Sequence, residues 1–395
     1  MKNVSVFITI VILGLAWLTG FSIAAAPASS VAPSGTVIPW SMFHHDPQHT
    51  GYSTSTVPST VSSLWNFTTY GPGAVSSSPA VADGKIFVGS DDNNLYALDQ
   101  TTGTALWIKS TLGVVHSSPA FADGRVFVGS NDGYLYALNA TPPGATLWSK
   151  SLVSGTVYAS PTVVAGTVYV TATQTTGNGY AWVYAIDVIT GNIKKSWQIG
   201  YAGYSYYISV HPSPAAVGDL VFFGAHSQYS YTGYASRVFA WNATSGSVKW
   251  ESTVVGGGNG VYLYSSPAVV PGSAVYVGND DGYLYALDYN TGALQWKIAT
   301  GGSIRSSPAI GYGKVFVGSN DKQVHAFTLG GAKVWNYTTG GNVRSSPAVA
   351  DGKVIVGSDD GYLYVLDATT GALVWKYFTG AQGIESSPAI ADGLV

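Results

Sequence analysis

The residues best suited to metal chemistry are concentrated in one short segment, residues 40–52. Three histidines and an aspartate stand there within six residues, namely His44, His45, Asp46 and His49. Imidazole and carboxylate groups are common zinc ligands, but this spacing matches no established zinc-binding pattern. The alternative is an irregular opening segment that lies over the first unit of the fold, and the sequence favours this alternative.

A second set of candidate ligands consists of paired acidic or amide residues that recur along the chain. The pairs are Asp91/Asp92, Asn131/Asp132, Asp280/Asp281, Asn320/Asp321 and Asp359/Asp360. Their oxygens are of the kind that calcium binds, but none belongs to a dense Asp-x-Asp-x-Asp-Gly loop. Ordinary turn chemistry explains these residues, so calcium stays open as an alternative and no metal is expected.

Several chemistries are excluded by composition. The chain has no cysteine, which excludes disulfides, thiolate metal sites and a lipidated cysteine. No Ser-His-Asp order and no His-Glu-x-x-His motif is present. The net charge is −3, without a basic run, so nucleic-acid binding has no electrostatic support.

The elements that must position these residues form a repeat of about 40 residues, clearest at residues 345–376. Four short apolar runs are separated there by Asp-Gly and Asp-x-x-Thr-Gly turns, which indicates a four-stranded antiparallel meander. A Ser-Pro element recurs at Pro79, Pro119, Pro161 (Ser160-Pro161), Pro214, Pro267, Pro308, Pro347 and Pro388. A closing tryptophan recurs at Trp65, Trp107, Trp148, Trp197, Trp250, Trp296, Trp335 and Trp375. Such a unit is typical of a β-propeller blade.

The two ends of the repeat array predict how the ring closes. Trp65 belongs to an isolated fourth strand, and the eighth unit begins at Pro388 and stops at Val395. Because ring closure removes exposed sheet edges, we expect an all-β, eight-bladed propeller whose last blade joins the Trp65 strand to residues 388–390. The eighth unit lacks its middle, so the sequence is expected to be truncated. The eight tryptophans are expected to be structural.

The chain divides into three parts. Residues 1–26 carry Lys2 and a long apolar run, and they are expected to be a signal peptide or a retained signal anchor. Residues 27–60 form a linker and opening segment. Residues 61–395 form the propeller. The protein is therefore expected to lie outside the cytoplasm, secreted or anchored at the cell surface, as a monomer.

The repeat motif resembles that of the quinoprotein (PQQ-like) propeller family. The residues that carry the resemblance are Ala97, Asp99, Thr102, Gly103 and Trp107, with a second complete copy at Ala286, Asp288, Thr291, Gly292 and Trp296. The resemblance implies the propeller fold and raises the question of PQQ-dependent catalysis. Dehydrogenases of this family use an adjacent cysteine pair, a calcium site and a catalytic aspartate on an inserted loop. Here the chain has no cysteine, and no acidic residue is found on an equivalent inserted loop. The non-catalytic branch, which includes a lipoprotein scaffold of outer-membrane assembly, is nearer in size.

Two blades differ from the others in length. Successive repeat prolines lie 39–42 residues apart, except for two intervals of 53 residues that meet at Pro214. The added residues fall between strands two and three, or between blades, which places them on one face of the ring. They are rich in tyrosine, at Tyr180, Tyr201, Tyr204, Tyr206, Tyr207, Tyr229, Tyr231, Tyr234, Tyr262 and Tyr264. Tyrosine among glycine and serine is typical of a binding surface, although such loops could also simply cover one another.

A ring of variable residues is predicted on the same face. The positions three residues before each repeat proline hold Ser76, His116, Tyr158, His211, Tyr264, Arg305, Arg344 and Glu385. Each lies at the entry to an innermost strand, by the mouth of the central channel, where ligands bind in many folds. We call these eight residues the entry ring.

The sequence therefore predicts an exported binding or scaffold module that is not an enzyme. Its expected partner is an extracellular protein or glycan, bound through the tyrosine-rich face and the entry ring. The alternative is a PQQ-dependent or other quinone-binding oxidoreductase.

Overall fold

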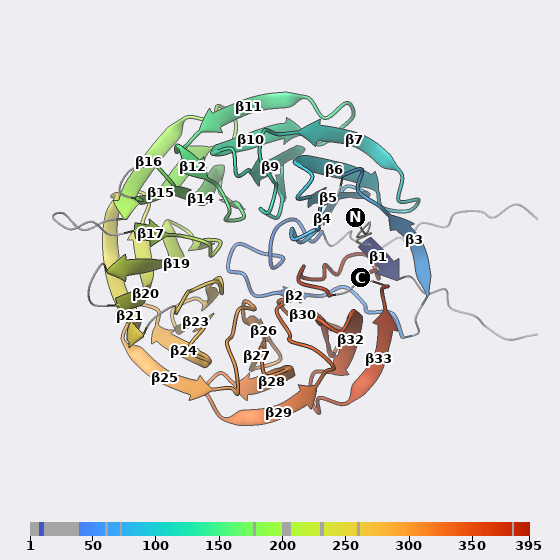
Figure 1. The fold of residues 1–395 in the computed structure, drawn as a ribbon, viewed down its shortest axis with the longest axis vertical. Helices are drawn as coiled ribbons and strands as arrows, with labels where there is room; N and C mark the ends of the chain where they lie inside the picture. The colour runs from blue at the N-terminus through green and yellow to red at the C-terminus, as the bar shows by residue number, and fades with distance from the viewer. Residues whose placement is uncertain are drawn as a thin grey trace, which may run out of the picture.

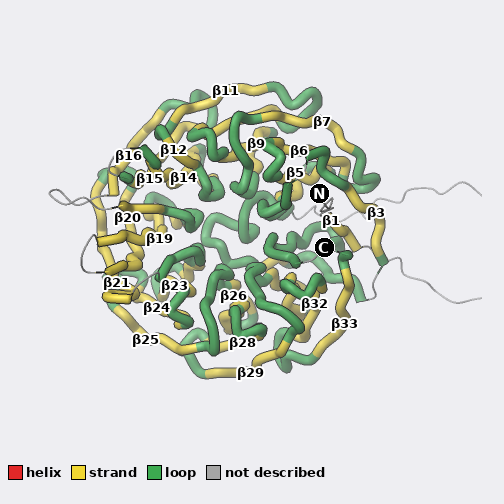
Figure 2. The backbone as a smooth tube through the Cα atoms, in the orientation of Figure 1, coloured by secondary structure: helices red, strands yellow, loops and turns green. Residues whose placement is uncertain are grey.

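The computed structural model describes residues 8–11, 39–59, 62–71, 73–176, 179–199, 207–229, 233–258, 261–380 and 383–395. Every regular element in this part of the chain is a β-strand (Figure 2). Figure 1 shows the sheets arranged as a ring around a central axis. The described residues form seven four-stranded antiparallel blades, each built from consecutive strands. The all-β propeller is confirmed, and the predicted number of eight blades is wrong.

Each blade runs from an innermost to an outermost strand. The innermost strands are β4 (Ala80–Ala82), β8 (Ala120–Ala122), β13 (Thr162–Val164), β18 (Ala215–Val217), β22 (Ala268–Val270), β26 (Ala309–Gly311) and β30 (Ala348–Ala350). The second strands are β5 (Lys85–Gly89), β9 (Arg125–Gly129), β14 (Thr167–Gln174), β19 (Leu220–Tyr229), β23 (Ala274–Gly278), β27 (Lys314–Gly318) and β31 (Lys353–Gly357). The third are β6 (Asn94–Asp99), β10 (Tyr134–Asn139), β15 (Ala181–Asp187), β20 (Gly233–Asn242), β24 (Tyr283–Asp288), β28 (Gln323–Thr328) and β32 (Tyr362–Asp367). The outermost are β7 (Ala105–Ser110), β11 (Thr146–Ser151), β16 (Ile193–Ile199), β21 (Ser247–Gly258), β25 (Leu294–Ala299), β29 (Lys333–Thr338) and β33 (Leu373–Phe378).

Five further strands complete the described elements. Three of them extend blades: β2 (Tyr52–Ser53) pairs with β30, β12 (Gly155–Thr156) with β14, and β17 (Tyr207–Ser209) with β19. The other two, β1 (Ile8–Val11) and β3 (Ser63–Phe67), pair only with each other.

Burial explains the sequence pattern within a blade. Four of the five residues of β31 and four of the six of β32 are buried, because both faces of these strands pack against neighbouring blades. The outermost strand β33 alternates between exposed and half-buried residues, which is the pattern of a sheet with one side facing water.

A tryptophan on the outermost strand ties most blades to the next. The indole of Trp335 donates a hydrogen bond to the carbonyl oxygen of Ala368 at 3.2 Å. Its ring lies against Gly371, where a Cβ atom would come within 2.6 Å of the indole and φ is 74°. Glycine is required there by both the close approach and the left-handed backbone. Equivalent bonds are donated by Trp65, Trp107, Trp148, Trp250, Trp296 and Trp375. Trp197 packs instead against Phe223 and Phe239.

The turn that receives the tryptophan is held by its aspartate. Asp99 Oδ1 accepts hydrogen bonds from the backbone N–H groups of Thr101 and Thr102 and from the Thr102 hydroxyl, at 2.8–3.0 Å. These donors, the Thr102 backbone foremost, lower the pKa of Asp99. The Asp-x-x-Thr-Gly pattern is therefore a turn motif.

A closed ring of serine hydrogen bonds lines the axis. A serine precedes each repeat proline. Its backbone N–H donates a hydrogen bond to the hydroxyl of the equivalent serine in the next repeat, at 2.9–3.1 Å. The members are Ser78, Ser118, Ser160, Ser213, Ser266, Ser307, Ser346 and Ser387, and Ser387 closes the ring by donating to Ser78. The inner rim therefore has eight positions, of which seven continue into four-stranded blades.

The eighth position explains why the blade count differs from the prediction. Trp65 lies at the outer rim and donates to the Gln100 carbonyl oxygen at 3.1 Å, whereas residues 386–390 lie at the inner rim. The predicted shared sheet is not formed, because β3 pairs with β1 and residues 388–390 form no strand. No described second or third strand connects the two pieces. A cavity of about 110 Å³ lies in this sector, lined among others by Val88, Leu363 and Ile384.

Residues 40–53, which we call the axial segment, lie along the centre of the ring (Figure 1). Their carbonyl oxygens accept hydrogen bonds of 2.6–2.9 Å from the innermost strands of six blades. The donors stand two residues after the repeat prolines, at Val81, Phe121, Ala216, Val269, Ile310 and Val349. The prediction that this segment lies over the first blade alone is wrong. The inner edge of a blade presents unpaired N–H groups, and one segment that winds around the centre of the ring accepts a hydrogen bond from six of the seven blades.

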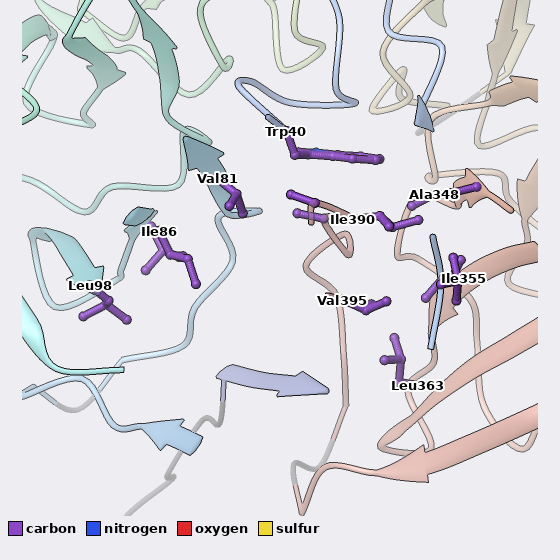
Figure 3. Close-up of a cluster of buried hydrophobic side chains, with 14 of the residues drawn as sticks. Trp40, Val81, Ile86, Leu98, Ala348, Ile355, Leu363, Ile390 and Val395 are labelled. Carbon is purple, nitrogen blue, oxygen red and sulfur yellow. The ribbon is translucent and has the colours of Figure 1, made fainter. Parts of the chain in front are cut away.

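Trp40 anchors the start of the axial segment. It is 1% exposed and belongs to a core cluster that joins the first blade, the seventh blade and the C-terminal residues. Figure 3 shows its ring between Val81 and Ala348, beside Ile390.

Candidate functional site on the hairpin face

One end of the ring carries both kinds of loop that the sequence places together. The tips between second and third strands bond to the connectors between blades, as in Asp91 N–H to Ala74 O and Asn320 N–H to Ser303 O, at 3.0 and 2.9 Å. We call this end the hairpin face. In six blades, the residue that donates its N–H to the axial segment stands five residues after the entry-ring residue. Five residues of extended chain span roughly 15 Å. The axial segment therefore lies deeper along the axis than the entry ring.

The entry ring forms a continuous line of side-chain contacts over five positions. The ring centroids of His116 and Tyr158 are 4.9 Å apart, those of Tyr158 and His211 5.1 Å, and those of His211 and Tyr264 5.1 Å. The Arg305 guanidinium then lies over the Tyr264 ring, 4.8 Å from its centroid. These residues come from five successive blades, so they form an arc around the axis.

A second layer supports the middle of the arc. His226 of β19 stacks on His211, with centroids 5.4 Å apart and planes 4° from parallel. Tyr262 meets His226 edge to face at 4.7 Å. The Ser209 hydroxyl lies 3.1 Å from Nδ1 of His211 and 3.3 Å from Nε2 of His226, which fixes both imidazoles.

Burial keeps these two imidazoles neutral. It lowers the pKa of His211 to about 4, with a smaller contribution from His116. Burial also lowers the pKa of His226 to about 3, aided by His211. At neutral pH the middle of the arc, at His211 and His226, is therefore aromatic and uncharged.

Ion pairs link the entry ring to the hairpin tips. Arg305 pairs with both carboxylate oxygens of Asp280, at 2.9 and 3.1 Å. Arg344 lies 3.5 Å from Asp359 and contacts Glu385.

His116 makes the equivalent contact in the first two blades. Its Nε2 lies 3.1 Å from Asp91 Oδ1. His116 and Arg305 thus each meet the tip of the blade before their own, whereas Arg344 meets the tip of its own blade.

Comparison with known proteins places the chain in a family. The family model described as outer membrane protein assembly factor BamB matches residues 54–142, 111–264 and 259–395. The chain belongs to this BamB family. The resemblance to PQQ-like propellers, and to their non-catalytic branch, is thereby confirmed.

Individual relatives match shorter stretches. The outer membrane protein assembly factor BamB of Yersinia pestis is 31% identical over 150 residues, 36% of this chain and 35% of that protein. The serine/threonine-protein kinase AfsK of Streptomyces griseus is 34% identical over 141 residues, 34% of this chain and 16% of the kinase. The matches thus span about a third or less of these relatives' own lengths.

Solved structures share the fold. BamB from Moraxella catarrhalis superposes with a TM-score of 0.61 at 21% identity, covering 81% of this chain and 92% of that one. A europium-containing methanol dehydrogenase superposes with a TM-score of 0.72 at 18% identity, covering 88% and 86%. At these identities the likeness concerns the fold alone.

The structure brings some of the predicted binding residues of this BamB-family chain together. Tyr264, His116, His211 and Arg305 lie in one arc, and Tyr262 lies in the layer that supports it. Arg344 and Glu385 are in contact with each other further around the entry ring. Tyr204, Tyr206 and Tyr231 lie outside the described residues. The backbones of Tyr207, Tyr229 and Tyr234 belong to β17, β19 and β20.

The sequence suggested that the insertions in blade four are loops, but in the structure much of them is β-strand. Residues 226–236 lie largely within β19 and β20, which are ten residues each, and β21 extends through twelve residues to Gly258. The added residues therefore lengthen the blade toward the hairpin face.

The hairpin aspartates that resembled calcium ligands have other partners. Asp132 Oδ2 accepts a hydrogen bond from the Tyr136 hydroxyl at 2.7 Å, and its Oδ1 accepts from the Tyr134 N–H at 3.0 Å. Asp360 bonds Tyr362 and Tyr364 in the same way. Within the described ranges, no group of three or more histidine, aspartate or glutamate residues is arranged to hold a metal ion.

His226 is the site residue that the sequence did not single out. It stands at the start of an insertion, in a stretch that lacks the repeat pattern. The signal in the sequence was its position directly after the apolar run 220–225, which marks a strand.

We expect stability to fall as the pH drops from 6.5 toward 4. His44, His49, His211 and His226 have pKa values lowered to between about 3 and 4 by burial, so the unfolded chain binds their protons first. Their contribution is complete above the unfolded pKa of about 6.5 and is lost below it. Each contributes a slope of at most about 1.4 kcal/mol per pH unit, measurable by urea unfolding at pH 7.5, 5.5 and 4.5. His226→Phe keeps the ring stack and should flatten the slope; an unchanged slope would contradict the burial argument.

Proposed function

We propose that this protein is an exported, non-catalytic binding module that holds a partner polypeptide at the hairpin face. The observation that carries the proposal is the arc from His116 to Arg305, in which four aromatic rings and a guanidinium from five blades adjoin without a break. Tyrosine and arginine are the residues enriched where interfaces derive most of their binding energy. The fold of five separate blades does not by itself require a continuous row of aromatic and arginine side chains at their ends.

The relatives agree with a role in protein contacts. BamB is by name an outer membrane protein assembly factor, and AfsK is by name a protein kinase that contains a matching stretch. An extracytoplasmic location fits the BamB likeness and the apolar residues 1–26. Within the described residues no helix is long and apolar enough to span a membrane. A glycan partner, a membrane anchor and a monomeric state stay predictions from the sequence.

The competing function is a PQQ-dependent or quinone-binding oxidoreductase. Its support is the fold shared with the methanol dehydrogenase. Titration with PQQ and calcium separates the two: stoichiometric binding at the hairpin face would favour the oxidoreductase, and no saturable binding would favour the module.

Replacing Tyr262 and Tyr264 by alanine tests the proposal. Truncation of an anchor residue typically weakens an interface by about 2 kcal/mol or more, roughly thirtyfold in Kd. We therefore expect the double variant to lose capture of the native partner from extracts of the cell envelope. Because both side chains are only partly buried, the melting temperature should fall by only a few degrees.

A matched control is Tyr312→Ala. Tyr312 is also partly exposed but lies in the turn between β26 and β27, at the end of the blade opposite the hairpin tips. Its variant should capture the partner normally. Equal loss in both variants, or retained capture in the double variant, would contradict binding at the hairpin face.

A further inference from the structure

We propose that the hairpin face recognises a cationic side chain, a lysine or arginine of the partner polypeptide, which enters along the axis between the aromatic arc and a set of carboxylates. This inference rests on the proposed function and names the chemistry of that same site.

The aromatic half of the site consists of Tyr158, His211 and Tyr264. Neither tyrosine hydroxyl has a hydrogen-bond partner in the described part of the chain. His211 is neutral at pH 7, as shown above. A half-circle of neutral aromatic rings attracts cations through the negative faces of the rings.

The opposite half of the site is acidic. Asp359 and Glu385 share one guanidinium, that of Arg344, and Asp91 faces only His116 among charged partners. Three carboxylates in this half, Asp91, Asp359 and Glu385, thus face one guanidinium, that of Arg344, so acidic side chains outnumber arginines here.

The serine ring shows that these two halves face each other. With eight hydrogen-bonded positions in the rim, each position lies opposite the one four steps away. His211, at the fourth position, is thus opposite Glu385 at the eighth. Tyr264, at the fifth, is opposite Ser76 and the neighbouring Asp91 at the first. The negative charges of Glu385 and Asp91 both contribute to raising the pKa of Tyr158, after burial, so the carboxylates act across the axis on the aromatic half.

The chain already holds one of its own cations in this way. Arg305 lies over the Tyr264 ring and pairs with Asp280 at 2.9 Å. A ring face at Tyr158 and a carboxylate at Glu385 are available to a cationic side chain of the partner. Arg305 shows that a ring and a carboxylate on this face can hold a cation between them.

Unpaired acceptor atoms point to the same class of ligand. Asn131 Oδ1, Asn320 Oδ1 and Asp359 Oδ1 are buried and accept no hydrogen bond within the described residues. All three stand at the first residue of a hairpin tip, in three different blades. Buried acceptors without donors are costly, and an ammonium or guanidinium group offers several N–H donors.

The axial segment limits how far a ligand can enter. It bonds six innermost strands below the serine ring, so the axis is occupied at that depth. A side chain can enter from the hairpin face, whereas a polypeptide cannot thread through. A lysine or arginine at a turn or chain end of the partner fits this constraint.

The test uses three acetylated and amidated pentapeptides, Gly-Ser-X-Ser-Gly, in which X is lysine, norleucine or glutamate. Binding to the full chain is measured by isothermal titration and peptide NMR line broadening at low salt. The lysine peptide should bind about tenfold more tightly than the norleucine peptide, and the glutamate peptide should not bind. Binding should weaken as salt rises.

Two variants locate the binding. Glu385→Gln and Tyr158→Leu should each weaken the lysine peptide about three- to tenfold. Matched controls are Glu251→Gln, on the outermost strand β21, and Tyr312→Leu, and both should bind like the parent. Equal affinity for lysine and norleucine, or losses as large in the controls, would overturn the inference.

The inference can fail without the proposed function failing. If acetylating the partner's lysines, replacing its arginines and Glu385→Gln all leave capture intact while the Tyr262 and Tyr264 double variant abolishes it, the face binds a partner but not through a cation. If the double variant also captures normally, the proposed function itself fails.

Discussion

Trp335→Ala should lower the free energy of unfolding by about 3–5 kcal/mol, the range for deleting a large buried aromatic side chain. Trp335 is 8% exposed, contacts Phe316 with ring centroids 5.7 Å apart, and donates its indole N–H to the carbonyl oxygen of Ala368 in the next blade. The substitution removes the packing and the link between two blades together. Urea unfolding followed by circular dichroism measures the effect.

Two comparisons separate these contributions. Trp335→Phe keeps much of the ring but not the donor, and should lose about half as much. Gly371→Ala leaves Trp335 in place but puts a methyl group 2.6 Å from its ring at φ 74°, so it should destabilise by a similar route. A loss below about 1 kcal/mol for Trp335→Ala would show that the blades hold together without this docking.

Trp40→Ala should produce a loss of similar size, about 3–5 kcal/mol, although Trp40 lies outside the repeats. Its ring fills a core shared by the first blade, the seventh blade and Ile390 (Figure 3). The loss should be accompanied by faster amide exchange at Val81, whose N–H donates to Trp40 O at 2.8 Å.

Phe43→Ala is the matched control for Trp40→Ala. Phe43 belongs to the same segment but is only partly buried, and its ring contacts are to His44 and His49. It should cost clearly less. If the two variants were equally mild, the axial segment would be an accessory to the ring and not part of its core.

The sequence predicts the blades well because their causes are local. Asp99 closes its own turn, Gly371 receives Trp335 from the blade before it, and the alternating burial of β33 follows from one exposed side. Each cause recurs about every 40 residues, so it is visible as a repeat. The arc is partly predictable for the same reason, since entry-ring positions are fixed by their distance from a repeat proline.

Features that depend on main-chain bonding between distant segments could not be predicted. The axial segment is held by carbonyl oxygens, from Trp40 to Gly51, which any sequence offers. The extension of β19 and β20 is likewise a backbone ladder, and its glycine, serine and tyrosine content resembles that of a loop. The repeat pattern also matches partial units, such as the Trp65 strand and the Pro388 element. It could therefore not show that residues 388–390 and β3 do not pair with each other.

The most direct test of partner binding at the hairpin face is site-specific photo-crosslinking in the producing cells. A photoreactive phenylalanine analogue is placed at Tyr158 or Tyr264, and in a parallel strain at Tyr312. We expect a crosslink to one discrete polypeptide from positions 158 and 264, through a peptide that contains lysine or arginine, and none to that polypeptide from position 312. A crosslink to the same polypeptide from position 312 alone would contradict binding at the hairpin face.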